Sequence, residues 1–143
     1  MEEVWLFLMS GTFILSIEDI QPSQLYISRD KLQVVLRKLE RDGIDSLEPI
    51  PIKRLDGELV STDGHTRLFA LYTLGLTETK AEWEDIELNW EAYRICVQWC
   101  KEEGITSIAG LEGRVIDSKS YETLWLKRCK IMHEALAVKG QEE

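Results

Sequence analysis

The run DGHTR at residues 63–67 joins a β-prone stretch to a segment with helical apolar spacing. A helix that begins at such a junction offers unpaired backbone N–H groups and a partial positive charge to anions. Gly64 allows close approach of the backbone, and Thr66 and Arg67 can donate to phosphate oxygens. Asp63 can hold a Mg²⁺ ion shared with the phosphates, and His65 can donate a hydrogen bond or transfer a proton near neutral pH. The sequence therefore predicts a phosphate-binding loop.

The same five residues also fit a purely structural explanation. Asp63 and Gly64 would form a turn, Thr66 would cap the following helix, and Arg67 would pair with one of the 26 acidic residues. The run lacks the Gly-x-x-x-x-Gly-Lys-Ser/Thr spacing of a Walker loop, and the chain has no Gly-x-Gly-x-x-Gly motif. Spacing alone leaves both explanations open.

Cysteine and histidine side chains form a second candidate cluster. Cys96 and Cys100 are spaced i, i+4 in one expected helix, and Cys129 and His133 are spaced i, i+4 in another. Each pair shares a helix face, so packing of the two helices could create a Cys₃His zinc site. The alternative is that the cysteines pack as small hydrophobic side chains within apolar stripes. We favour packing over zinc, because zinc sites usually include a Cys-x₂-Cys knuckle and this chain has none.

Short strands and two helices are expected to surround the loop in the first part of the chain. Strands are expected over residues 3–9, 12–17, 50–55, 58–62 and 79–85, and helices over 29–41 and 66–74. Ser28 is the expected N-cap of the first helix and Gly43 its end. The pair Asp56-Gly57 is typical of a hairpin turn.

The pattern becomes fully helical from Asp85. Helices are expected over 89–103, 106–113 and 119–137, the last with Ser118 as its N-cap. The composition changes near residue 84, which predicts an α+β domain over 1–84 and a small helical appendage over 85–143.

Composition and charge exclude several classes of function. The 143 residues are 44 % hydrophobic and 30 % charged, which is typical of a soluble globular protein. The net charge of −9 argues against binding to DNA or to anionic membranes. Three cysteines do not suggest a disulfide framework, the N-terminal apolar run begins with two glutamates, and no stretch is long enough to span a bilayer. We expect a cytoplasmic protein.

The order of these elements resembles the ParB/sulfiredoxin superfamily. The resemblance rests on IEDIQPSQLYIS, a helix, and then PIPIKRLDGELVSTDGHTRLFALYTLG, and it covers residues 12–83. In that superfamily a strand with a proline-containing bend leads to a helix, and a Pro-Ile strand and a hairpin then lead to a ligand loop at a helix start. The resemblance implies a small mixed sheet with helices. The helical half is similar to the short helical tail of other ParB-like proteins, a likeness that implies no activity.

Three branches of the superfamily differ at the loop. Sulfiredoxins carry a cysteine at the position of Gly64, so the resemblance does not extend to their chemistry. ParB partition proteins bind CTP through a Gly-Glu-Arg-Arg loop, of which Gly64 and Arg67 match. Free serine kinases carry an Asp-Gly-His loop that contacts nucleotide phosphate and Mg²⁺, and all three of these residues match. Their catalytic glutamate corresponds to Gln24 here, so either this protein is not a serine kinase or another acid such as Glu18 replaces that glutamate as the base.

The resemblance thus implies that Asp63, Gly64, His65, Thr66 and Arg67 bind a nucleotide (ATP, ADP or CTP) with Mg²⁺ at Asp63. If the protein is an enzyme, it is expected to be a small-molecule kinase or a nucleotide hydrolase, with Asp63 and His65 in catalytic roles. The alternative is a non-catalytic adaptor or sensor that binds a protein partner through its helical part, and Gln24 favours this alternative.

Overall fold

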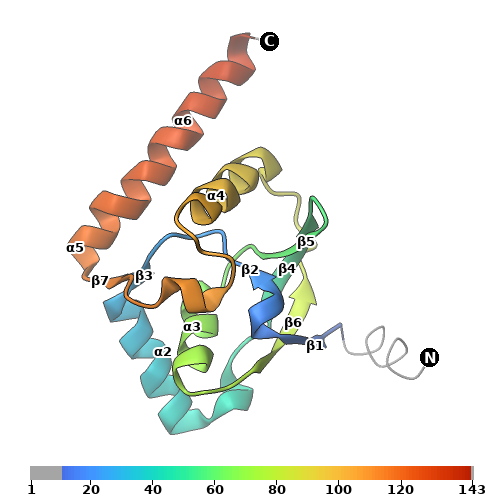
Figure 1. The fold of residues 1–143 in the computed structure, drawn as a ribbon, viewed down its shortest axis with the longest axis vertical. Coiled ribbons are helices and arrows are strands. Elements are labelled where there is room, and N and C mark those ends of the chain that lie inside the picture. The colour runs from blue at the N-terminus through green and yellow to red at the C-terminus, as the bar shows by residue number, and fades with distance from the viewer. Residues whose placement is uncertain (1–10, 143) are drawn as a thin grey trace.

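The computed structural model describes residues 11–142, so the expected strand over residues 3–9 lies outside the described part. The described chain is an α+β fold built on a five-stranded mixed sheet in the order β1-β6-β4-β5-β2 (Figure 1). Its strands are β1 (Phe13–Ser16), β2 (Ile20–Gln21), β4 (Ile50–Leu55), β5 (Glu58–Ser61) and β6 (Glu78–Trp83). β1 pairs antiparallel with β6, and β4 with β5, whereas β4–β6 and β2–β5 are parallel. The expected fold class is confirmed.

The β4–β5 hairpin leads the chain into the DGHTR loop. Ile50 and Ile52 of β4 are buried in the main apolar cluster, and Leu55 is buried in a smaller cluster with Val60 and Val97. Asp56 and Gly57 have φ angles of 52° and 83°, and positive φ at both central residues is the geometry of a type I′ hairpin turn. The expected Asp56-Gly57 turn is therefore confirmed, and it fixes the register that brings β5 to Ser61.

Two helices pack together beside the sheet and carry the predicted site. In α2 (Arg29–Asp42), the Ser28 hydroxyl accepts the Lys31 N–H at 3.4 Å, and Gly43 follows with φ 84°. The expected cap and end of this helix are confirmed. The shorter α3 (His65–Thr73) is the central helix, with Leu68 and Ala70 fully buried (Figure 1).

The second part of the chain is mainly helical, and one of its strands pairs with a strand of the first part. It contains α4 (Trp90–Glu102), the 3₁₀ helix η3 (Ile108–Leu111), β7 (Val115–Ile116), α5 (Ser118–Tyr121), the π-helical η4 (Glu122–Leu126) and α6 (Lys127–Glu142). β7 pairs in parallel with β3 (Ile27–Ser28), two short strands that the sequence pattern did not predict. The segment from α5 to α6 is a single long rod along the outside of the molecule (Figure 1).

The N-cap of this rod differs from the prediction. Asp117, not Ser118, is the N-cap, because the Asp117 carboxylate accepts the Ser120 N–H at 2.7 Å. The Ser118 hydroxyl instead donates to Asp30 at the start of α2. The rod is thus attached to α2 at its first turn.

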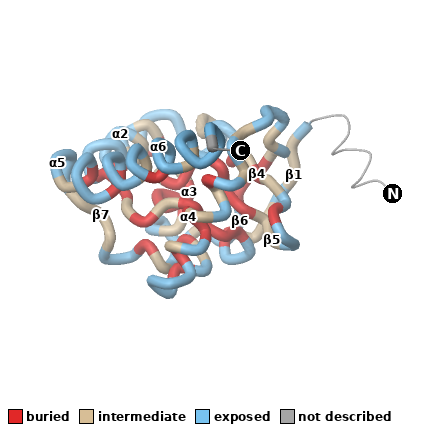
Figure 2. The backbone as a smooth tube through the Cα atoms, turned by 90° about the horizontal axis from the view of Figure 1, so that it is seen from above, coloured by how far each residue is buried: buried red, intermediate tan, exposed pale blue. Residues whose placement is uncertain are grey.

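Buried apolar side chains form a cluster that includes residues from both sides of residue 84. Ile20, Ile52 and Leu68 belong to the same cluster as Cys96 and Trp125, and the buried stretches meet in the interior of the molecule (Figure 2). The division at residue 84 into a domain and an appendage stays a prediction. Within residues 11–142, no helix has the length and apolar character needed to cross a membrane.

Candidate functional site

The DGHTR run forms the turn between β5 and the N-terminus of α3. Gly64 is the N-cap and adopts the left-handed conformation, with φ 77° and ψ 17°. The first intrahelical hydrogen bond runs from the Leu68 N–H to the Gly64 carbonyl at 2.9 Å. The N–H groups of the three residues between them are free of intrahelical partners, and no side chain caps the helix. Thr66 therefore does not cap α3, which corrects the structural explanation of that residue.

Gly64 is tightly enclosed. A Cβ atom at this position would lie 2.6 Å from Nη2 of Arg67 and 3.0 Å from Cδ1 of Ile50. Both the positive φ and the lack of space therefore require glycine here.

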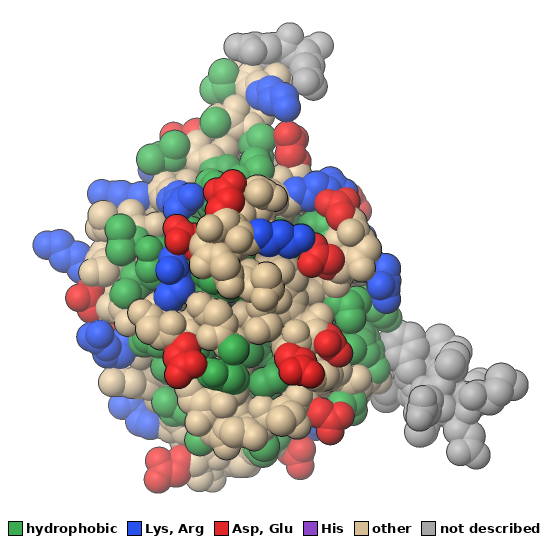
Figure 3. All heavy atoms as spheres, viewed as in Figure 1, with side chains coloured by type: hydrophobic (Ala, Val, Ile, Leu, Met, Phe, Trp, Pro, Cys, Tyr) green, Lys and Arg blue, Asp and Glu red, His purple; other side chains and the backbone are tan. Residues whose placement is uncertain are grey.

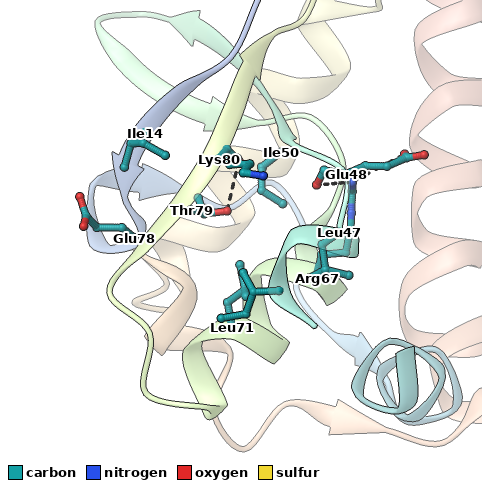
Figure 4. A pocket seen from close by; sticks show the side chains of 10 residues that line it. Ile14, Leu47, Glu48, Ile50, Arg67, Leu71, Glu78, Thr79 and Lys80 are labelled. Carbon is teal, nitrogen blue, oxygen red and sulfur yellow. Dashed lines mark hydrogen bonds and ion pairs between the residues drawn. The ribbon is translucent and has the colours of Figure 1, made fainter. Parts of the chain in front are cut away.

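Arg67 is anchored by backbone carbonyls. Its Nη1 donates to the carbonyl of Glu48 at 2.9 Å and to that of Pro49 at 3.2 Å, and it lies 3.9 Å from Oε2 of Glu48. The arginine points from α3 toward the segment before β4, next to Glu48 (Figure 4). One edge of the guanidinium thus holds that segment, while Nη2 lies close to Gly64. The arginine places a fixed positive charge behind the loop.

His65 is buried and held in one tautomer. Its Nε2 accepts the Ser23 N–H at 2.9 Å and lies 3.1 Å from the Ser61 hydroxyl. Because a backbone N–H can only donate, the neutral ring must carry its proton on Nδ1. Burial, with a smaller contribution from Arg67, lowers the pKa of His65 to about 4 against an opposing effect of Asp63. The expected proton transfer near neutral pH is therefore corrected: His65 is a neutral hydrogen-bond donor through Nδ1.

The neutrality of His65 predicts a pH dependence of stability. The pKa of His65 is about 4 in the fold and 6.5 ordinarily, so between these values the unfolded chain binds more protons. The stabilisation from neutral His65 is complete above the ordinary pKa and is lost as the pH falls toward the folded value. In denaturant unfolding from neutral pH to about pH 4.5, wild type should lose more stability than His65→Gln. Equal losses in the two proteins would contradict this assignment.

All five loop residues line one open cavity of about 410 Å³ at the N-terminus of α3. The other walls come from α2 and from the segments around Gln24 and Tyr121. Lys31, an exposed residue in the first turn of α2, contributes an amine and lies with Nζ 5.4 Å from the centre of the Tyr121 ring. Lys31 and Tyr121 are not predicted from the sequence, because no local pattern shows that α2 and α5 meet at this loop.

Asp63 is exposed and is the only carboxylate among residues 11–142 that lines this cavity. Among residues 11–142 it makes no hydrogen bond or ion pair, so its oxygens are available to a ligand or to a cation that the ligand brings. Glu18, considered above as a replacement base, lines a different cavity beside Tyr72 and Ile108. Glu18 therefore does not replace the missing acid at this site.

The Gln24 side chain makes hydrogen bonds within the fold. Its side-chain amide donates to the Tyr26 carbonyl at 2.7 Å and to the Tyr121 hydroxyl at 3.0 Å. The amide therefore joins the bend after Pro22 to α5, and it cannot accept a proton as a carboxylate does.

The four candidate zinc ligands do not form a metal site. Within the described residues, no group of three or more His, Cys, Asp or Glu side chains is placed to hold a metal ion. The Cys100 thiol points to the Gln24 carbonyl at 3.5 Å, and burial raises its pKa to about 12. Cys96 donates a hydrogen bond to Cys129, which lowers the pKa of Cys129. Cys96, Cys129 and His133 line a second cavity of about 330 Å³, but the Cys₃His arrangement is absent.

Comparison with solved structures supports the expected fold. A Pnob8-like ParB-N domain matches 92 % of this chain and 50 % of its own chain, with a TM-score of 0.50 and 20 % sequence identity. The chain has a ParB/sulfiredoxin-like fold. The resemblance stated from the sequence is thereby confirmed at the level of the fold.

Two further structures share parts of this ParB/sulfiredoxin-like fold. Sulfiredoxin from Arabidopsis thaliana covers 60 % of this chain and 96 % of its own, with a TM-score of 0.47 and 19 % identity. A free serine kinase variant in complex with AMP covers 52 % of this chain, with a TM-score of 0.47 and 20 % identity. The chain spans 31 % of the length of that kinase and 50 % of that of the ParB-N protein. No model of a known protein family and no curated protein sequence matches the chain.

Proposed function

We propose that this protein binds a nucleotide through its phosphates at the N-terminus of α3. One observation carries the proposal: the uncapped end of α3 opens into a cavity lined by all five residues from Asp63 to Arg67. Free N–H groups and the helix dipole favour an anion at this position. The left-handed Gly64 brings the backbone to the cavity without a side chain in between.

Each lining group has a chemical role in this proposal. The N–H groups at the start of α3, the Thr66 hydroxyl and Nδ1–H of His65 donate to phosphate oxygens. Lys31 neutralises charge from the opposite wall, and Arg67 does so from behind the loop instead of by a two-pronged contact. The cavity volume of about 410 Å³ lies in the range of small-molecule sites.

Asp63 fits a Mg²⁺ ion that arrives with the nucleotide. Mg²⁺ is commonly held by one or two carboxylates together with substrate phosphates and water, and Asp63 offers one exposed carboxylate without a partner in the described chain. The ion would neutralise phosphate charge at the mouth of the cavity.

A thermal-shift panel tests the proposal. ATP, ADP, AMP, CTP and GTP are each added with and without Mg²⁺ to wild type, to Asp63→Asn and to Asp85→Asn. Asp85 is an exposed carboxylate outside the cavity and serves as the matched control. A ligand that binds only the folded state raises the melting temperature. We expect a Mg²⁺-dependent rise in wild type and in Asp85→Asn, and loss of the Mg²⁺ dependence in Asp63→Asn.

The absence of any rise at millimolar nucleotide would contradict the proposal and would leave the loop a structural turn. Arg67→Ala is a poorer probe, because it also removes the hydrogen bonds to the carbonyls of Glu48 and Pro49. Its effect on ligand binding would be mixed with a loss of stability.

Whether binding leads to phosphoryl transfer depends on a base. A kinase or nucleotide hydrolase needs a group that accepts or orients the attacking hydroxyl, and in the part of the chain that the structure describes Asp63 is the one carboxylate in the cavity. The engaged amide of Gln24 favours the second candidate, a nucleotide-responsive adaptor without catalysis. A turnover assay separates the two: Mg²⁺-dependent phosphate release that Asp63→Asn abolishes supports an enzyme, whereas nucleotide binding without turnover supports the adaptor.

A further inference from the structure

The rod formed by α5, η4 and α6 has apolar side chains on two different sides. The inward side packs on the core through Tyr121, Trp125, Cys129, Met132 and Leu136. On another side, Leu124, Ile131 and Val138 are 46 %, 66 % and 55 % exposed. The first side is explained by the fold, whereas the second is uncovered within the described chain.

The exposed side chains follow a heptad spacing. Ile131 and Val138 are seven residues, or two α-helical turns, apart in α6 and lie along the same side of it, and Leu124 precedes Ile131 by seven residues across the wider π-helical turn of η4. Figure 3 shows hydrophobic and charged side chains interspersed over this face of the molecule. The rod lies along the outside of the molecule in Figure 1. A second helix could therefore reach this stripe without displacing another element.

Two exposed charges follow the same side of the stripe. Lys127 precedes Ile131 by one turn, and Glu134 follows it by one turn. Within residues 11–142 neither forms an ion pair, although six other pairs do. Arg128 differs, because its guanidinium stacks on Trp99 at 4.1 Å from the ring centre. Lys127 and Glu134 are therefore free to meet charges on a partner.

These positions are self-complementary when two copies of the rod lie antiparallel. A two-fold axis at Ile131 places each Ile131 against the partner's Ile131 and each Leu124 against the partner's Val138. The same axis brings each Lys127 to the partner's Glu134 along the same edge of the stripe. In a parallel pairing the two-fold axis runs along the rods, so each edge of the stripe faces the opposite edge of the partner, and Lys127 does not meet Glu134. An interface in which the same patch meets itself is the usual arrangement of a two-fold dimer.

We propose that this protein forms a two-fold homodimer through antiparallel pairing of its C-terminal rods. Leu124, Ile131 and Val138 form the apolar seam, and two Lys127–Glu134 pairs fix its direction and register. A single helix from each subunit makes a small contact area, so the dimer is weak and depends on concentration. The phosphate cavity and the inward side of the rod are unchanged in this arrangement.

Charge reversal tests the proposal. Sedimentation velocity of wild type across a wide concentration range should show a monomer–dimer equilibrium. Lys127→Glu alone and Glu134→Lys alone each face like charges and should raise the dissociation constant at least about tenfold. The double variant Lys127→Glu/Glu134→Lys should restore the wild-type value. A mixture of the two single variants should form a heterodimer, because every pair across that interface is then of opposite charge.

Ile131→Asp should abolish the dimer, while Ile86→Asp at a site 63 % exposed in a loop should not. Circular dichroism and melting temperature establish that each variant is folded. A wild-type protein that is monomeric at all concentrations would overturn the proposal. So would a dimer that survives Ile131→Asp, or charge variants that neither weaken nor restore it.

Discussion

Replacing Trp125 with alanine is expected to lower the free energy of unfolding by about 3–5 kcal/mol, the range for deleting a large buried aromatic side chain. Trp125 is 6 % exposed and packs edge-on against Trp99, with ring centroids 6.2 Å apart. It also belongs to the cluster that contains Ile52 and Leu68 of the first part of the chain. The loss should therefore destabilise the whole protein and not only the rod.

Urea unfolding followed by circular dichroism measures this effect, with Leu126→Ala as the matched control. Leu126 follows Trp125 directly in the sequence but lies on a different side of the helix, where it is 48 % exposed. Its replacement should cost less than about 1 kcal/mol, since little packing is lost. A loss in Trp125→Ala as small as in Leu126→Ala would show that the rod does not support the sheet, and it would favour a separable appendage over residues 85–143.

The second large effect is expected for Gly64→Ala, which should remove nucleotide-induced stabilisation and cost about 2–4 kcal/mol of stability. A left-handed alanine alone costs roughly 1–2 kcal/mol. The remainder comes from the new Cβ, 2.6 Å from Nη2 of Arg67 and 3.0 Å from Ile50. Arg67 cannot simply move away, because the carbonyls of Glu48 and Pro49 hold it.

Gly75→Ala separates the two contributions. Gly75 has a φ angle of 82°, close to the 77° of Gly64, but nothing lies within 4 Å of its Cβ position. Chemical unfolding of both variants, followed by the nucleotide thermal-shift assay, gives the comparison. Equal losses of stability, or nucleotide binding retained in Gly64→Ala, would show that the enclosure of Gly64 has no role in the loop.

Local patterns predicted much of the fold. The Ser28 cap, the Asp56-Gly57 turn and the helix over 29–41 depend on neighbouring residues, and the structure confirms them. The β3–β7 pair was not predicted, because two-residue strands leave no periodic pattern and their partners are distant in sequence. The cap of the rod was misplaced by one residue, since Asp117 and Ser118 are both good N-caps and only the contact of Ser118 with Asp30 distinguishes them.

For the candidate site too, contacts within the loop were predicted from the sequence and contacts between distant segments were not. The sequence placed the five loop residues together because they are consecutive, and the structure gathers all of them around one cavity. It could not show that His65 is buried, since the group that fixes its tautomer is the N–H of Ser23 in the distant loop between β2 and β3. Nor could it show Lys31 and Tyr121 in the wall, because their positions depend on how α2 and α5 pack.

The pairing of β3 with β7 affects how the protein folds while it is being synthesised. Ile27 and Ser28 leave the ribosome long before Val115 and Ile116, which are their strand partners. The hydrogen bond from the Gln24 amide to the Tyr121 hydroxyl likewise cannot form until Tyr121 has been made. Nascent chains fold progressively from the N-terminus. The five-stranded sheet can therefore form before β7, the partner of β3, has been made. Chains interrupted before α5 would therefore lack the wall that Tyr121 contributes to the cavity at the N-terminus of α3, and this cavity is complete only after α5 has been made.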